Sequence, residues 1–289
     1  MKYRFTYFLI STLVIGSGFI SIMKWGLKLG VDFNGGSILE YKLEKNLSTE
    51  EVTRKIEELD IEVSSIQEIG EKLYLLRFST ITSEQKEKIK ETIEKISEGK
   101  VDELRFENVG PSIGPDLIKK TIYAVAIAAV AILLWVAYQF KSIKFGASAI
   151  LAMFHDSLVL IGFFSLLGHF FGAELDFLFV TAMLTILSFS VHDTIVVYDR
   201  IRESQIKFSG TIYELANKAI SETMVRSLNN SFTIIFMIVA LILLGGSTVR
   251  WFAIALLIGT ISGTYSSPFV AVPLLVTWDE VSKRFKSRN

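Results

Sequence analysis

Six long runs of apolar residues alternate with polar segments along most of the chain. A helix needs about 20 such residues to cross a bilayer. The predicted spans are Phe5–Met23, Thr121–Phe140, Phe145–Leu167, Phe177–Tyr198, Ser227–Leu244 and Trp251–Thr277. The last run is long enough to tilt or bend, since Pro268 and Pro273 lie late in it. The basic start of the chain also fits a signal peptide, but no small-x-small cleavage site follows it. The pattern therefore predicts an α-helical polytopic membrane protein.

The segment between the first two spans has a different pattern, with short alternating runs typical of strands and amphipathic helices. Two candidate capping boxes, Ser48–Glu51 and Thr82–Gln85, each precede a helical pattern. The predicted strands are Ser37–Leu43, Ile61–Gln67, Lys72–Phe78 and Val101–Val109. The resulting order, βαββαβ, is a ferredoxin-like α+β arrangement. The predicted parts are 1–24 (N-terminus and first span), 25–117 (inserted domain with its linkers), 118–278 (the other five spans) and 279–289 (a basic tail).

Glycine-rich linkers flank the inserted domain. Val31–Gly36 leads into it and Asn108–Pro115 leads out of it. The candidate hinge residues are Asp32, Gly35, Gly36, Gly110, Pro111 and Gly114. Paired glycines permit positive φ and close backbone approach. Two interpretations stay open, a pair of tight structural linkers and a hinge that lets the domain swing relative to the membrane.

The charges separate along the chain in a way that predicts its orientation. Hydrophobic residues make up 51% of the sequence, and the mean hydropathy is +0.45. Residues 25–117 carry 20 acidic and 13 basic side chains, whereas the rest carries 10 and 17. The bases gather in alternate loops and at both termini, so the positive-inside rule predicts cytoplasmic termini and an extracytoplasmic insert. The acidic insert argues against nucleic-acid binding.

Ionisable side chains inside apolar spans are costly and invite a functional reason. Asp156 lies beside His155 in the third span, Asp193 lies beside His192 in the fourth, and Arg226 begins the fifth. We expect Asp193 and Arg226 to form a buried pair, which is either a proton-coupled switch or a static ion pair that fixes helix register. Secondary polar candidates are His192, Ser188, Thr194, Asp156 and His155.

The fourth span also carries a polar stripe at helical spacing. Its members are Thr181, Thr185, Ser188, His192 and Asp199. Such a stripe either lines a hydrated path or faces another helix. The sequence has no Cys, no metal-ligand spacing, no phosphate-binding loop and no nucleophile motif, so we expect neither a metal, nor a cofactor, nor enzymatic catalysis.

Several motifs together resemble the SecF family of protein-export membrane subunits, over essentially the whole chain. They are Val31–Gly36, Val109–Gly114, His155-Asp156, Ser190–Thr194 followed by Tyr198–Glu203, and Arg226–Ser231. The string from Asp193 to Glu203 is the most specific of them. The sequence departs from the family pattern at two positions, since His192 stands where Asn is more usual and Asn230 where Thr is more usual.

The resemblance implies a fold, a function and partners. The fold is half of an RND-type transporter, with six spans and a soluble domain between the first two. The function is that of an auxiliary subunit of the Sec translocase in the bacterial inner membrane. With SecD, it would use the proton-motive force to promote late translocation or release of the preprotein on the outer side. Asp193 and Arg226 fall on the family's intramembrane acid and base.

The implied partners are SecD as a heterodimer, the SecYEG channel, YajC, YidC, the translocating preprotein and the lipid bilayer. Two alternatives stay open. One is a proton-independent scaffold that stabilises the translocon, and the other is one half of a small-molecule exporter of the RND superfamily.

Overall fold

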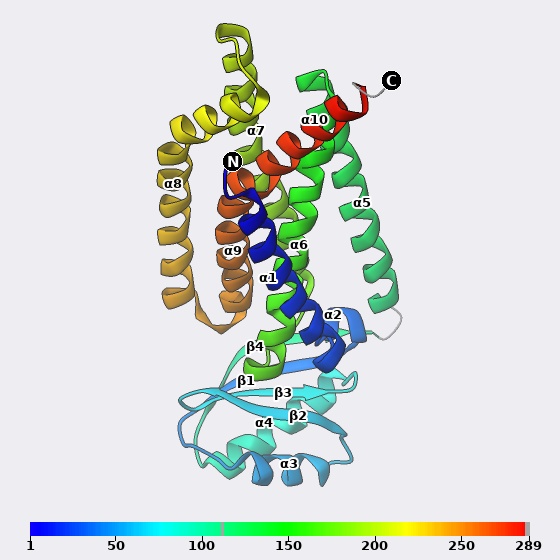
Figure 1. Cartoon of the computed structure of the whole chain (residues 1–289). Coiled ribbons are helices and arrows are strands. Elements are labelled where there is room, and N and C mark those ends of the chain that lie inside the picture. The colour runs from blue at the N-terminus through cyan, green and yellow to red at the C-terminus, as the bar shows by residue number, and fades with distance from the viewer. Residues whose placement is uncertain (111–112, 287–289) are drawn as a thin grey trace. The chain divides into compact units, whose positions relative to one another are not determined.

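The computed structural model describes residues 1–110 and 113–286 and divides into two compact units (Figure 1). The first unit joins Met1–Lys28 to Ile122–Asn289, and the second is Leu29–Thr121. The first holds the long apolar helices and the second holds the inserted domain.

Six helical segments are long and apolar enough to cross a membrane, as the hydrophobic pattern predicted. They are α1 (Arg4–Trp25), α5 (Ile113–Phe140), α6 (Ile143–Phe171), α7 (Phe177–Lys207), α8 (Ile212–Leu244) and the last span, which joins α9 (Gly246–Ser266), the π-helical turn η1 (Ser267–Ala271) and α10 (Val272–Lys286). Several observed helices extend beyond the predicted spans. For example, α8 begins at Ile212 behind a capping box in which Thr211 and Glu214 bond reciprocally.

The last span widens at its proline. Pro268 has no N–H to donate and its ring crowds the preceding turn. The chain accommodates it in the π-helical turn Ser267–Ala271 rather than ending the helix. This irregular turn lies inside the helix bundle, because Ser267, Pro268, Val270 and Ala271 are all buried.

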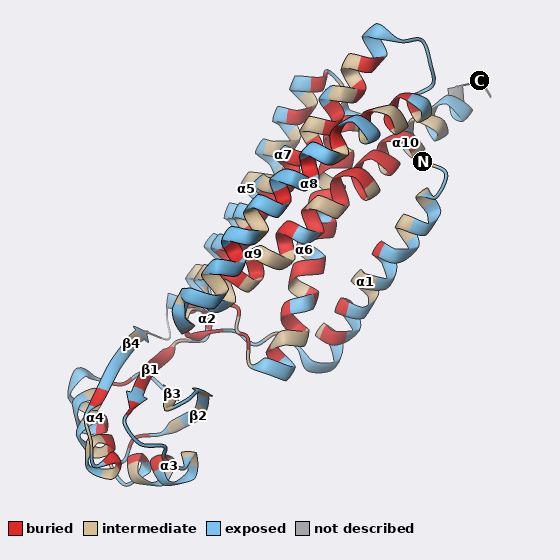
Figure 2. Cartoon of the chain, turned by 90° about the vertical axis from the view of Figure 1, so that its left-hand side faces the viewer, coloured by how far each residue is buried: buried red, intermediate tan, exposed pale blue. Residues whose placement is uncertain are grey.

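Helices α6, α7 and α9 form the middle of this unit, and α1, α5 and α8 lie outside them. Helix α9 packs against α6, α7 and α8, and α1 lies along α6. Close approach depends on glycine: a Cβ on Gly259 would lie 2.1 Å from the Ile186 side chain, and one on Gly162 would lie 2.7 Å from the Cα of Gly18. Helices α5 and α8 are mostly exposed, with apolar outer faces suited to lipid (Figure 2).

The inserted domain has the predicted βαββαβ order. Its elements are α2 (Val31–Asn34), β1 (Gly36–Leu43), α3 (Thr49–Glu57), β2 (Val63–Gly70), β3 (Leu73–Phe78), α4 (Ser83–Ser97) and β4 (Val101–Val109). The strands form one antiparallel sheet in the order β2-β3-β1-β4. Leu39 and Tyr41 of the sheet share a buried core with Ile56 of α3 and Ile89 of α4.

One of the two predicted capping boxes in this domain is formed. Thr82 accepts from the Gln85 backbone N–H, and the Gln85 side chain accepts from the Thr82 N–H. Ser48 occupies the N-cap position of α3, but its side chain makes no capping hydrogen bond. Helix α3 is nevertheless held by burial of Val52 and Ile56.

Candidate functional site

Asp193 lies buried where α7 meets α8. It is 4% exposed, and the Ser227 hydroxyl of α8 lies 2.7 and 2.8 Å from its two carboxylate oxygens. A charged group at this depth is expensive unless hydrogen bonds compensate it. Ser227 supplies such a bond, so the α7–α8 contact is built around this acid.

The predicted buried pair of Asp193 and Arg226 is not formed. Arg226 is exposed, and the residues that the structure describes give it no ion pair. Successive helical residues point about 100° apart. Because Ser227 faces Asp193, its neighbour Arg226 points out of the unit, which corrects the expectation drawn from the sequence.

Asp156 on α6 is completely buried and has several hydrogen-bond partners. The hydroxyls of Ser190 on α7 and of Ser262 and Ser266 on α9 each donate to its carboxylate at 2.6 Å. His155 Nδ1 lies 3.1 Å from the same carboxylate. The carboxylate therefore links three helices. The predicted adjacency of His155 and Asp156 becomes a direct contact, in a cluster that includes serines the sequence analysis did not single out.

Helix α9 and the π-helical turn that follows it continue this polar core toward Asp193. The Ser267 hydroxyl lies 3.0 Å from that of Thr194, the residue after Asp193. The Thr264 hydroxyl lies 2.7 Å from that of Ser231 on α8. Thr260, Ser262, Thr264 and Ser266 alternate along α9. This run of hydroxyl residues in an apolar span was the available sign of the polar core.

The predicted polar stripe on α7 lies on the surface of this chain. Ser188 and His192 are exposed, whereas Thr194 is buried on the other side of the helix. Exposed polar residues continue on α8. Together the two helices form an exposed polar face, which we define as Thr181, Thr185, Ser188, His192, Arg226, Asn229, Asn230 and Thr233.

The glycine-rich linkers meet within the inserted unit. Asp32 lies in the short helix α2, and Gly35 and Gly36 follow it with φ of +76° and +122°. A Cβ on Gly36 would lie 2.7 Å from the Phe78 carbonyl oxygen, and one on Gly114 would lie 2.0 Å from that of Phe33. Gly110 accepts from the Ile113 N–H at 3.1 Å. Close packing and positive φ therefore explain why glycine stands at Gly35, Gly36 and Gly114. A hinge motion stays a prediction. Pro111 lies outside the described residues.

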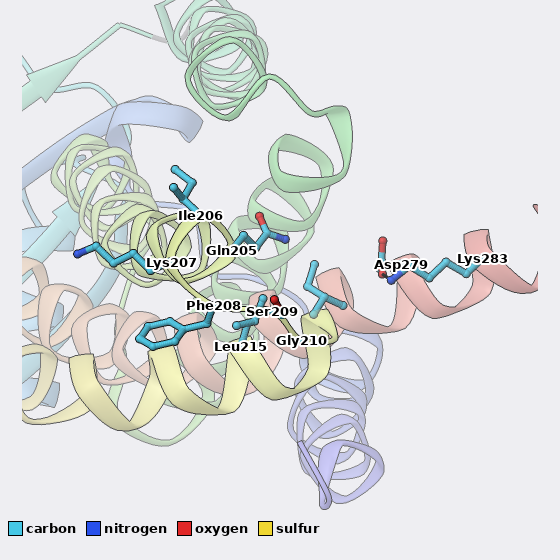
Figure 3. A pocket seen from close by; sticks show the side chains of 10 residues that line it. Gln205, Ile206, Lys207, Phe208, Ser209, Gly210, Leu215, Asp279 and Lys283 are labelled. Carbon is cyan, nitrogen blue, oxygen red and sulfur yellow. Dashed lines mark ion pairs between the residues drawn. The ribbon is translucent and has the colours of Figure 1, made fainter.

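A separate cavity of about 440 Å³ lies where the α7–α8 connection meets α10 (Figure 3). Lys207, Phe208 and Leu215 line it on one side and Asp279 and Lys283 on the other. It includes none of the candidate site residues. Within residues 1–110 and 113–286, no three His, Asp or Glu side chains gather as metal ligands would. The bundle does hold two buried carboxylates, Asp156 and Asp193, each with hydrogen-bond partners on neighbouring helices.

Comparison with known proteins gives a consistent result. The family model for the C-terminal part of the protein export membrane proteins SecD and SecF matches residues 88–281. The protein translocase subunit SecF of Thermobaculum terrenum is 40% identical over 96% of this chain and 93% of its own length. The fused subunit SecDF of Bacillus subtilis is 31% identical over 94% of this chain but only 37% of its own length.

A solved structure extends the match to three dimensions. The crystal structure of SecDF from Thermus thermophilus, described as a translocon-associated membrane protein, superposes with a TM-score of 0.85 at 32% identity. The match covers 97% of this chain and 38% of that one. The RND-like half with an inserted ferredoxin-like domain is thus confirmed as the fold. This multi-pass membrane chain belongs to the SecD/SecF family of protein export membrane proteins.

Proposed function

We propose that this chain is an auxiliary subunit of the Sec translocase that works with SecD and couples the proton-motive force to late preprotein translocation or release. Its family membership and its relatives, which are translocase subunits, support the Sec role. The fused relative SecDF, of which this chain matches one part, supports partnership with SecD. SecYEG, YajC and YidC are further proposed partners, the proposed location is the bacterial inner membrane, and release occurs on the outer side.

The observation that carries the coupling proposal is the buried contact between Asp193 and Ser227. A hydroxyl group can donate one hydrogen bond and accept others. Ser227 therefore donates to the ionised carboxylate and accepts from the protonated one. Asp193 has a partner in both protonation states, as a group that repeatedly takes up and releases a proton requires. The change alters the direction of one hydrogen bond at the contact between α7 and α8.

The exposed polar face extends this proposal to the partner. Its residues lie in segments long and apolar enough to span the membrane, where polar groups facing lipid are unfavourable. We infer that SecD covers this face. The route by which protons reach Asp193 then runs between the two proteins, past Ser188 and His192. In this proposal the Arg226 side chain lies outside the α7–α8 contact. It interacts electrostatically with the charge of protons on this route and does not pair directly with Asp193.

The linkers pass the motion to the inserted domain in this proposal. Gly36 and Gly114 bring the two connections close to their neighbours, so a displacement of either connection is transmitted to the domain. The domain lies on the outer side of the membrane, where the preprotein emerges. A swing of the domain about Gly35 and Gly110 then favours release.

The test measures preprotein release from membrane vesicles that contain this chain, SecD and SecYEG, with and without an uncoupler. Asp193→Asn is compared with Asp116→Asn, which neutralises an exposed acid that pairs with Lys120. We expect Asp193→Asn to assemble and to release preprotein as slowly as the uncoupled wild type does, whereas Asp116→Asn behaves as wild type.

Two results would contradict the proposal in different ways. Normal uncoupler-sensitive release by Asp193→Asn would place the proton route elsewhere. If Asp193→Asn no longer co-purified with SecD, the acid would instead be a structural element of a scaffold.

A further inference from the structure

The carboxylate of Asp156 is held by more donors than packing of one helix pair requires. Three serine hydroxyls and one imidazole nitrogen surround it. A carboxylate offers about four acceptor sites, and the three serine hydroxyls fill three of them. The donating hydroxyls come from α7 and α9, and two of them, Ser262 and Ser266, lie one turn apart on α9. Such a two-point attachment fixes the rotation of α9 about its own axis as well as its distance.

Two consecutive serines at the junction of α9 and the π-helical turn contact different partners. Ser266 donates to Asp156 at 2.6 Å, and Ser267 lies 3.0 Å from the Thr194 hydroxyl. Ser267 also donates to the Gly263 carbonyl oxygen at 3.1 Å. The widened turn begins at Ser267, where the regular hydrogen-bond ladder changes register. Any rotation of α9 that pulled Ser266 from Asp156 would therefore also move Ser267 away from Thr194.

Glycine lets α9 come close enough for this geometry. A Cβ on Gly263 would lie 3.2 Å from the Cβ of Ser190, the α7 serine that donates to Asp156. Ser190 also accepts from Ser267 through its backbone oxygen at 3.4 Å. The two ends of the arrangement, Asp156 and the Thr194 turn next to Asp193, are thus joined through the same short stretch of α7 and α9.

We propose that Asp156 is a positioning residue that sets the rotation of α9 and thereby holds Ser267 against Thr194 beside Asp193. Its importance for translocation rests on the proposed role of Asp193, but the positioning itself does not. An amide in place of the carboxylate turns two of the four acceptor sites into N–H donors, which then face serine hydroxyls. Asp156→Asn therefore preserves the shape of the side chain while it loosens the attachment of α9.

The cysteine-free sequence permits a direct test by cross-linking. Thr194→Cys with Ser267→Cys reports the α7–α9 contact beside Asp193. Ser21→Cys with Ser165→Cys reports the α1–α6 contact, where the two hydroxyls lie 2.8 Å apart. Cross-linking rates are measured for the full chain in membranes with SecD, in the wild-type background and with Asp156→Asn.

Ser148→Ala is the matched control. Ser148 is also buried on α6 and its hydroxyl lies 2.7 Å from that of Tyr198 on α7, so its loss removes a comparable α6–α7 contact away from Asp156. We expect Asp156→Asn to slow cross-linking of the first pair about tenfold, the population change that corresponds to ~1.4 kcal/mol, roughly one hydrogen bond. The second pair and the Ser148→Ala background should stay at the wild-type rate.

Three outcomes decide the matter. An unchanged rate for the first pair in Asp156→Asn overturns the proposal, and so does an equal fall for both pairs, because that indicates general loosening. If Asp156→Asn does not insert, Ser262→Ala and Ser266→Ala each remove one donor, and unchanged rates in both variants also overturn it. Because the readout is a cross-linking rate, the inference survives a result in which Asp193→Asn keeps uncoupler-sensitive release and the proposed function fails.

Discussion

Single buried hydroxyls in this chain differ in whether they have partners. Tyr74 donates to the Leu47 carbonyl oxygen at 2.8 Å and accepts from the Leu47 N–H at 2.9 Å. Tyr41 is completely buried in the same core, and its hydroxyl has no hydrogen-bond partner among the described residues. A buried polar group without a partner costs stability, whereas a paired one contributes to it.

We therefore predict opposite effects for two chemically identical substitutions. Tyr41→Phe should leave the free energy of unfolding of the inserted domain unchanged or raise it by up to about 1 kcal/mol, whereas Tyr74→Phe should lower it by ~1–3 kcal/mol. Hydrogen exchange of the domain in the full chain measures both values. A larger loss for Tyr41→Phe than for Tyr74→Phe would show that the Tyr41 hydroxyl has a partner.

Tyr41 also makes the stability of the inserted domain depend on alkaline pH. Burial, followed by the charges of Glu103, Glu87 and Glu94, raises the pKa of Tyr41 well above its usual value. A group whose pKa is raised on folding contributes its full stability below the unfolded pKa, about 10 for tyrosine. That contribution is lost as the pH rises from there toward the folded pKa. The decline should be smaller in Tyr41→Phe, and equal declines in the two proteins would contradict this assignment.

Among the elements, the packing of α1 on α6 depends on two glycines in contact. A Cβ on Gly162 would lie 2.7 Å from the backbone of Gly18, whereas one on Gly16 would have no neighbour within 4 Å. We predict that Gly162→Ala lowers the melting temperature in detergent, through a loss of ~1–3 kcal/mol of packing energy, and that Gly16→Ala does not. Equal melting temperatures for the two variants would mean that α1 moves away from α6 at no cost.

The sequence predicted the helices and strands themselves better than the contacts between them. The apolar runs and the alternating pattern of the insert predicted every span and strand, because burial in lipid or in a sheet imposes a period on the chain. Contacts between elements were harder to predict. The sequence indicated a polar α7, but whether Ser227 or Arg226 faced Asp193 depended on a rotation of about 100°. The partners of Asp156 come from residues 190, 262 and 266, which only the packing of three helices brings together.

The outer surface of the transmembrane unit is not apolar throughout. Its exposed polar face includes Arg226 and His192, although the surrounding helix surfaces are apolar. The relative SecDF of Bacillus subtilis contains a further part besides the one that matches this chain, since the match covers only 37% of its length. A separate SecD that covers the face would restore a lipid-compatible surface.

Ion pairs and a terminal contact tie several helix ends together at one end of the transmembrane unit. Arg4 of α1 pairs with Glu280 of α10 at 2.7 Å, and Lys144 of α6 pairs with Asp279 at 3.1 Å. The Met1 amino group contacts Asn217 of α8. The N-terminus, α10 and the α7–α8 connection thus lie at one end of the transmembrane unit (Figure 1). Trp25 stacks on His169 at the other end, where the chain leaves α1 for the insert.

We predict that the end with the termini is cytoplasmic and that the insert is outside, since Lys and Arg are retained on the cytoplasmic side. Single cysteines in the otherwise cysteine-free chain test this with a membrane-impermeant maleimide on spheroplasts. Glu87→Cys on α4 should label in intact spheroplasts, and Ser209→Cys between α7 and α8 should label only after lysis, because both positions are exposed and the predicted orientation puts them on opposite sides of the membrane. The reverse pattern would invert the molecule and place the inserted domain where it cannot meet an emerging preprotein. The proposed role in release would then fail whatever the chemistry of Asp193.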